Sequence, residues 1–338
     1  MAVLANGVPT LHNWAKSLDP SGRTARVVEA LNQKNPILRD VPYVEGNLPT
    51  GHRDSIRTGL PAVAWRLLNQ GVAPTTSTEA QVDFQCGLME AWAEVDTEVA
   101  KLNGNSPTFR AMKAKAFIEA MGQEAAQTLF YGNQGLAQEE FTGLTPFYSS
   151  LSGSTADNVI TGAGSGADNS SVWLIGWGDE TIHGIFPLGS MAGLMHQDLG
   201  EETAEITAGV GGTRMRVFRD KFTWKMGLVV KDWRYGVRIC NIDISNLVAE
   251  SSAADLIKLM SRALDRPPDD QGVSLVFYCN RTVFSMLRIQ ALNKSANALA
   301  VVPALDQFGN PIGRGELQFD GVPIRRCDQL LTTEAAVA

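Results

Sequence analysis

The sequence predicts an α+β protein with one long helix, an extended hairpin, a β-rich region and a smaller unit of alternating helices and strands. Three observations lead to this fold class. Apolar residues recur at helical spacing over residues 106–131. Gly and Pro interrupt a two-limbed segment at 47–86, and short helix and strand patterns alternate over 246–330. No internal repeat occurs at any period.

Residues 1–46 form a polar lead that contains one short predicted helix. Asp19 opens its starting turn, Val28 and Leu31 belong to a narrow apolar stripe, and Pro36 ends the pattern. A helix of this length is marginal by itself in water. We therefore expect it to pack on a partner surface, which belongs either to its own chain or to a neighbour.

Residues 47–86 indicate a long hairpin with an irregular tip. Alternating apolar and polar residues form the second limb, and Gly and Pro mark the bends. The tip carries Trp65, Leu67 and Leu68. An apolar tip needs a surface to cover it. That surface is either a neighbouring subunit or the hairpin's own domain.

Residues 106–131 give the strongest helix prediction. Ser106 suits the N-cap, Pro107 suits the first helical position, and Gly132 provides a stop. Met112, Phe117 and other apolar residues fall on adjoining sides at i+4 steps. At 1.5 Å per residue, the rod is about 37 Å long.

The region after this helix is β-rich. Strands are predicted at 172–177, 183–186 and 214–221, and the pair 222–230 and 233–242 continues them as an antiparallel meander. Residues 253–264 then predict a helix and 273–278 a strand. Asn280 caps a helix that runs to about residue 292, and residues 317–324 form a strand, a tight turn and a strand.

Composition excludes several functional classes. The net charge is −7, from 29 basic and 36 acidic residues. The sequence has no run of Lys and Arg, so it does not predict a nucleic-acid-binding module. The four Cys are widely spaced, which favours free, reduced thiols over disulfides or a metal site. The sequence has no run of 18 apolar residues, so no membrane span is predicted, and it shows no recognisable signal peptide.

None of the candidate catalytic, cofactor-binding or metal-binding motifs in the sequence is complete. The GAGSGA segment at 162–167 matches a dinucleotide fingerprint, but a strand follows it where a helix is required. The four His lack ligand spacing, no GxSxG elbow occurs, and the Asp cluster at 265–270 surrounds two Pro in a polar turn. We expect no catalytic, cofactor-binding or metal-binding residues, and no enzymatic activity.

Several stretches together carry a family resemblance. They read EGNLPTGHR at 45–53, LFYGN at 129–133 with FTGL at 141–144, KDWRY at 231–235, FYCNR at 277–281 and FDGVPIRRC at 319–327. Each is weak alone, but as a set they span nearly the whole chain. The chain resembles the major capsid proteins of tailed bacteriophages, of the Hong Kong 97 fold.

The resemblance implies four parts: an N-terminal arm at 1–46, an extended loop at 47–86, a peripheral domain at 87–245 with a spine helix at 106–131, and an axial domain at 246–338. It implies hexamers and pentamers that build an icosahedral shell, which encloses double-stranded DNA without binding it specifically. It also implies a virion location after assembly in the host cytoplasm, with no membrane, and possible portal and decoration proteins as partners. Candidate intersubunit contacts are Arg53, Arg57, Trp65, Arg66, Leu67 and Leu68.

Two departures from the family matter. Some members crosslink their subunits covalently through a Lys on the extended loop, but residues 47–86 contain no Lys. Arg stays protonated and cannot replace that nucleophile, so we expect no such crosslink. The chain starts almost directly at the arm, which favours a separate scaffolding protein. The alternatives are another virion protein or a cellular encapsulating shell of the same fold, and an enzyme with an unrecognised site.

Overall fold

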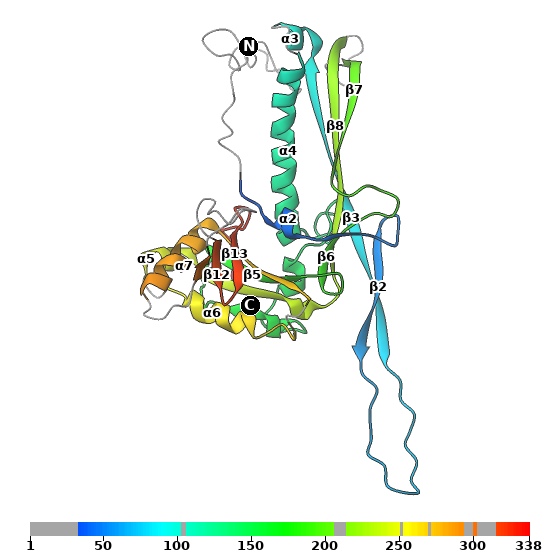
Figure 1. Cartoon of the computed structure of the whole chain (residues 1–338), viewed down its shortest axis with the longest axis vertical. Coiled ribbons are helices and arrows are strands. Elements are labelled where there is room, and N and C mark those ends of the chain that lie inside the picture. The colour runs from blue at the N-terminus through cyan, green and yellow to red at the C-terminus, as the bar shows by residue number, and fades with distance from the viewer. Residues whose placement is uncertain are drawn as a thin grey trace. The chain divides into compact units, whose positions relative to one another are not determined.

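The computed structural model describes residues 33–102, 106–205, 214–250, 253–269, 272–293, 300–302 and 316–338 (Figure 1). Of these, residues 33–35, 88–126 and 193–225 belong to one compact unit, called unit 1, and the remainder form unit 2. Three long elements continue from one unit into the other, namely β3 (Thr78–Asp96), α4 (Ser106–Tyr131) and β8 (Arg214–Val230). The short helix predicted after Asp19 lies outside the described residues.

Unit 1 packs a helix against an antiparallel sheet. The helix is α4 (Ser106–Tyr131), of 26 residues, as the sequence predicted. In the sheet, β8 (Arg214–Val230) lies between β3 (Thr78–Asp96) and β7 (Leu194–Glu205). The helical apolar stripe explains the packing, because it places Phe109 against Val95 and places Met121 against Ala93 and Phe222. The short helix α3 (Thr97–Lys101) follows β3.

The meander predicted for residues 214–242 is wrong. β8 is one continuous strand that pairs with β7 along its first part and with β6 (Ile182–Phe186) at its end. It does not pair with β9 (Gly236–Asp243), which lies between β5 and β4 instead. β9 is buried along nearly its whole length, and such a strand needs partners on both edges. The polar strand β7 was not predicted, because it lacks clear apolar alternation.

Unit 2 is built on a mixed sheet in the order β11-β12-β13-β10-β5-β9-β4. The central strand β5 is buried at every residue, as expected for a strand covered on both faces. β10 runs antiparallel to β5 and parallel to β13. The bounds are β4 (Val159–Thr161), β5 (Asn169–Trp177), β10 (Ser274–Cys279), β11 (Ala300–Val302), β12 (Glu316–Phe319) and β13 (Val322–Arg326).

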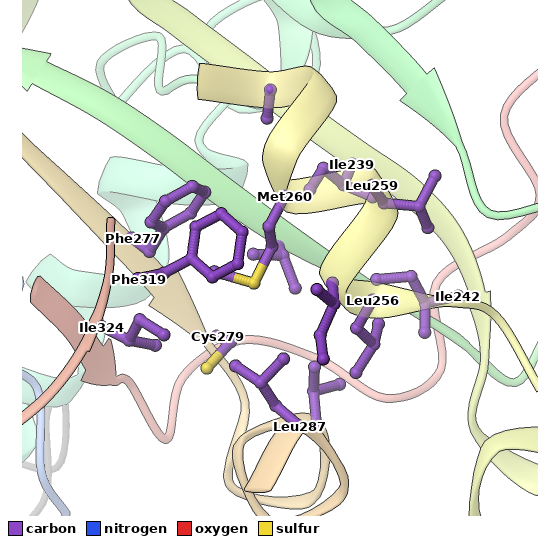
Figure 2. Close-up of a cluster of buried hydrophobic side chains, with 14 of the residues drawn as sticks. Ile239, Ile242, Leu256, Leu259, Met260, Phe277, Cys279, Leu287, Phe319 and Ile324 are labelled. Carbon is purple, nitrogen blue, oxygen red and sulfur yellow. The ribbon is translucent and has the colours of Figure 1, made fainter. Parts of the chain in front are cut away.

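Helices cover one face of this sheet. They are α5 (Ile244–Ala249), α6 (Leu256–Leu264) and α7 (Arg281–Asn293). Figure 2 shows Met260 beside Phe319 and Phe277, and Leu287 on the side of Cys279, in one apolar core. Burying each such side chain contributes about 1.5–3 kcal/mol. The cap predicted for α7 is confirmed, because Asn280 Oδ1 accepts a hydrogen bond from Thr282 N at 3.0 Å.

Aromatic side chains cover the other face. Trp173 contacts Tyr148 and Phe130, with ring centroids 5.8 and 6.2 Å away. Phe130 comes from the last turn of α4, and this turn lies close to the FTGL segment. A Cβ atom on Gly143 would lie 2.3 Å from the Thr128 carbonyl oxygen. Glycine at this position therefore explains the paired LFYGN and FTGL motifs in physical terms.

The remaining elements of unit 2 lead into the hairpin and connect the strands. They are α2 (Ile37–Asp40), β1 (Tyr43–Glu45), β2 (Gly51–Gly59) and the 3-10 turns η1 (Thr145–Tyr148), η2 (Ala156–Asn158) and η3 (Trp233–Tyr235). β1 pairs in parallel with β6, and β2 pairs with β3 as the predicted hairpin. Residues 60–77, between these two strands, have no regular structure (Figure 1).

Candidate assembly surfaces

The tip of the hairpin is an exposed apolar segment. Trp65 is 103% exposed, Leu68 90% and Leu67 70%, so none of the three packs on the described part of the chain. The alternative in which the hairpin folds back to bury its tip is therefore not what the structure shows. Arg66 is the only charged residue in residues 60–77. The predicted contact residues of the tip thus form one apolar patch with a single positive charge.

Arg53 and Arg57 lie on the limbs of the hairpin, away from the tip. Arg53 faces Asp83 across the two strands, with Nε 2.6 Å from Oδ1 and Nη2 2.6 Å from Oδ2. The hydrogen bonds from Arg53 hold the pKa of the Asp83 carboxyl below its usual value. Arg57 faces Glu79 at 3.5 Å. The two residues of each ion pair lie directly opposite one another in the register of the hairpin, and both guanidinium groups stay accessible.

The foot of the hairpin is anchored in unit 2. Phe84 packs with Ile185 and Val229 in a small buried cluster. The Asn47 side chain both donates to and accepts from the backbone of Arg53, at 2.7 Å each. These contacts hold the two strands where they join the unit and leave the tip without support. Rigid limbs with an uncovered apolar end suit insertion into another surface.

A buried charged cluster holds the C-terminal segment to the sheet. Arg238 Nη2 lies 2.9 Å from Glu334 Oε2, and both side chains are almost completely buried. Arg238 also donates to Ser171 Oγ and to the Tyr148 carbonyl. Tyr131, the last residue of α4, donates to the other oxygen of Glu334. Sequence reasoning missed this cluster, because its members lie far apart in the chain and form no motif.

The sheet of unit 1 presents a charged surface around Trp92. This side chain is 41% exposed and lies between Arg219 and Lys221, whose charged groups are 5.4 and 5.1 Å from its ring. Arg219 pairs with Glu94, and Lys221 pairs with Glu90. The pairing of these charges stiffens the strands. The sequence signal that could have revealed this surface is the alternation of apolar and polar residues over 88–96. The sequence analysis did not interpret this alternation separately.

The described part of the chain shows neither a metal site nor a membrane-spanning helix. Within it, no group of three or more His, Cys, Asp or Glu side chains is arranged to hold a metal ion. None of the helices there combines the length and apolar character needed to cross a bilayer. The surfaces that stand out are thus the apolar tip, the anchored foot of the hairpin and the charged sheet of unit 1.

A spine helix, a long hairpin and a mixed sheet covered by helices define the Hong Kong 97 type of capsid fold. A chain in the cryo-EM structure of bacteriophage Epsilon15 has this arrangement, with a TM-score of 0.80, 30% identity, and coverage of 100% of this chain and 99% of that chain. A family model described as "Major capsid protein GP7" matches residues 19–338. The chain belongs to this family of major capsid proteins and is a capsid shell protein.

More distant shells show weaker likeness. The bacteriophage JBD30 capsid shares 12% identity at a TM-score of 0.45, with coverage of 92% of this chain and 99% of that one. The SrpI encapsulin of Synechococcus elongatus PCC 7942 shares 9% identity, also at 0.45, with coverage of 68% and 94%. No curated protein is similar enough in sequence to match this chain.

Proposed function

We propose that this capsid protein assembles as hexamers and pentamers into an icosahedral shell that encloses double-stranded phage DNA. The observation that carries this proposal is the uncovered apolar tip of the hairpin, with Trp65, Leu67 and Leu68 all largely exposed. An exposed patch of this kind marks a protein interaction site. The partner is another copy of the chain, because a shell is built from repeated copies of one subunit.

The energy available from docking is substantial. Complete burial of an aromatic side chain removes about 150–250 Å² from water. At about 25 cal/mol/Å² this corresponds to roughly 4–6 kcal/mol for Trp65, before the cost of ordering the tip. Leu67 and Leu68 add about 1.5–3 kcal/mol each when fully buried. Repetition over many subunits then stabilises the shell through multivalency.

The proposal also assigns the parts of the chain, the polar contacts between subunits and the assembly partners. The parts are an N-terminal arm at 1–46, an extended loop at 47–86, a peripheral domain at 87–245 and an axial domain at 246–338, named for their places in a shell. Arg53, Arg57 and Arg66 add polar contacts to the neighbour. The shell assembles in the host cytoplasm with a separate scaffolding protein, a portal and possible decoration proteins. The chain encloses DNA without specific binding and catalyses no reaction.

The test removes the tip without disturbing the limbs. Deleting residues 62–73, or changing Trp65→Ser, Leu67→Ser and Leu68→Ser together, should abolish shells in negative-stain electron micrographs while the subunit stays folded. Leu136→Ser is the matched control, because Leu136 is 88% exposed at a site outside the hairpin. That variant should assemble normally. Shells of unchanged number and size from the triple variant would refute the docking role of the tip.

A further inference from the structure

Two histidine side chains meet at the foot of the hairpin. His52 is the second residue of β2, opposite Phe84 on β3. His183 is the second residue of β6, opposite Val229 on β8. The two rings are perpendicular, with centroids 6.3 Å apart and an interplanar angle of 81°. This histidine pair therefore lies where the hairpin is attached to the sheet of unit 2.

His183 is fully buried and His52 partly buried, and the surroundings of the pair suit the neutral form of His183. His183 is 1% exposed. The Nδ1 atoms of both rings are buried and have no hydrogen-bond partner among the residues that the structure describes. A protonated imidazole carries an N–H on both nitrogens. Protonation would thus create a charged, buried N–H group that has no acceptor.

The charges around His183 act mainly in the same direction. Burial, then the positive charge of Lys231 and then His52, lower the pKa of His183, whereas Asp179 and the Gly178 carbonyl oppose them. Lys231 Nζ itself lies 3.4 Å from Asp54 Oδ2. The charged groups that act on His183 are Lys231 after β8 and Asp179 after β5, and Lys231 in turn pairs with Asp54 on β2 and lies 3.8 Å from Glu180.

We propose that the histidine pair is a proton-sensitive attachment of the extended loop, and that protonation loosens the contact between β2 and β6 so that the loop can move. The attached state is fully stable above the ordinary His pKa of about 6.5, because the buried His183 ring is held in its neutral form there. It weakens as the pH falls below that value, because a detached His183 takes up a proton more easily. The Phe84 cluster is apolar and remains intact, so the hairpin loosens without unfolding unit 2.

The effect on assembly rests on the docking role proposed above, but the loosening is a property of the single subunit. The test is therefore hydrogen–deuterium exchange on the unassembled full chain between pH 8 and pH 5, corrected for intrinsic exchange rates. Peptides covering residues 51–57 and 79–83 should exchange faster at acidic pH, by about tenfold per unit of pKa lowering. Peptides from β5 and β9 should keep their protection. His183→Gln should remove the acid response.

Matched variants separate this role from a general acid effect. His196→Gln, on β7 of unit 1, should retain the full response, because its ring is half exposed and bonded to Asp220. His52→Gln should reduce the response, and it serves if His183→Gln does not fold. An acid response that persists when His52→Gln and His183→Gln are combined, or a wild-type hairpin that exchanges equally at both pH values, would overturn the proposal. Neither outcome depends on whether the tip variants still form shells.

Discussion

Replacing Arg238 with Met should destabilise unit 2 strongly. The guanidinium group is buried and donates to Glu334 Oε2 at 2.9 Å, to Ser171 Oγ at 3.1 Å and to the Tyr148 carbonyl at 3.0 Å. The Met side chain fills most of the aliphatic space but makes none of these bonds. It therefore leaves the Glu334 carboxylate buried without its positive partner.

The expected cost is large because burial magnifies an unpaired charge. Breaking a buried ion pair from one side costs about 3–5 kcal/mol. Removing both charges is far milder, because replacement of a buried pair by apolar residues is often close to neutral. Arg238→Met combined with Glu334→Leu should therefore recover about half or more of the loss of the single variant.

The assay is urea unfolding followed by Trp fluorescence, with the free energy of unfolding obtained by linear extrapolation. Trp173 reports directly, because its ring lies 5.3 Å from the guanidinium carbon of Arg238. The single variant should lose about 3–5 kcal/mol. A loss below about 1 kcal/mol, or a double variant as unstable as the single one, would show that the ion pair is not what holds the C-terminal segment.

Three further predictions concern unit 2. Gly143→Ala should lower the free energy of unfolding of unit 2 by about 1–3 kcal/mol, because the new Cβ would lie 2.3 Å from a carbonyl oxygen of α4. The control Gly153→Ala, where the new Cβ would have nothing within 4 Å, should leave the same urea titration unchanged. Asn158→Ala should cost about 1–3 kcal/mol, because its amide donates to two carbonyls at 2.8 Å, and a thermal melt that matches wild type would contradict this. In timed alkylation at pH 8, Cys86, half-buried with its pKa raised to about 11 by burial, should react first of the four thiols. Faster labelling of any of the buried thiols, Cys240, Cys279 or Cys327, would refute this order, and urea should equalise all four.

Sequence reasoning succeeded where the signal is local. The helical stripe and the flanking Gly132 identified α4, and alternation with Gly and Pro identified the hairpin. The Asn280 cap and the strand-turn-strand at β12 and β13 also depend on a few neighbouring residues. For the candidate surface, an apolar cluster in a loop rich in Gly and Pro was enough to locate the exposed tip.

Sequence reasoning failed where partners are distant. Nothing near β8 or β9 says that β9 pairs with β5 and β4, because strand partners are selected by burial over the whole sheet. Arg238 and Glu334 are 96 residues apart, so no spacing rule connects them. The histidine pair escaped notice for the same reason. Its rings meet through strand register and not through a motif.

The position of β5 in the sheet has a consequence for how the subunit is made. β5 needs β10, and β10 in turn needs β13, so the sheet cannot close until translation has reached the region after Asp320. The hydrogen bond from Trp177 to Tyr278 alone spans 101 residues. At about 5–20 residues per second, roughly 7–30 s pass between the synthesis of β5 and the synthesis of β13, and the apolar faces of β5 are not fully covered during that time. During that interval the nascent chain is exposed to aggregation, and closure of the unit 2 sheet ends this exposure.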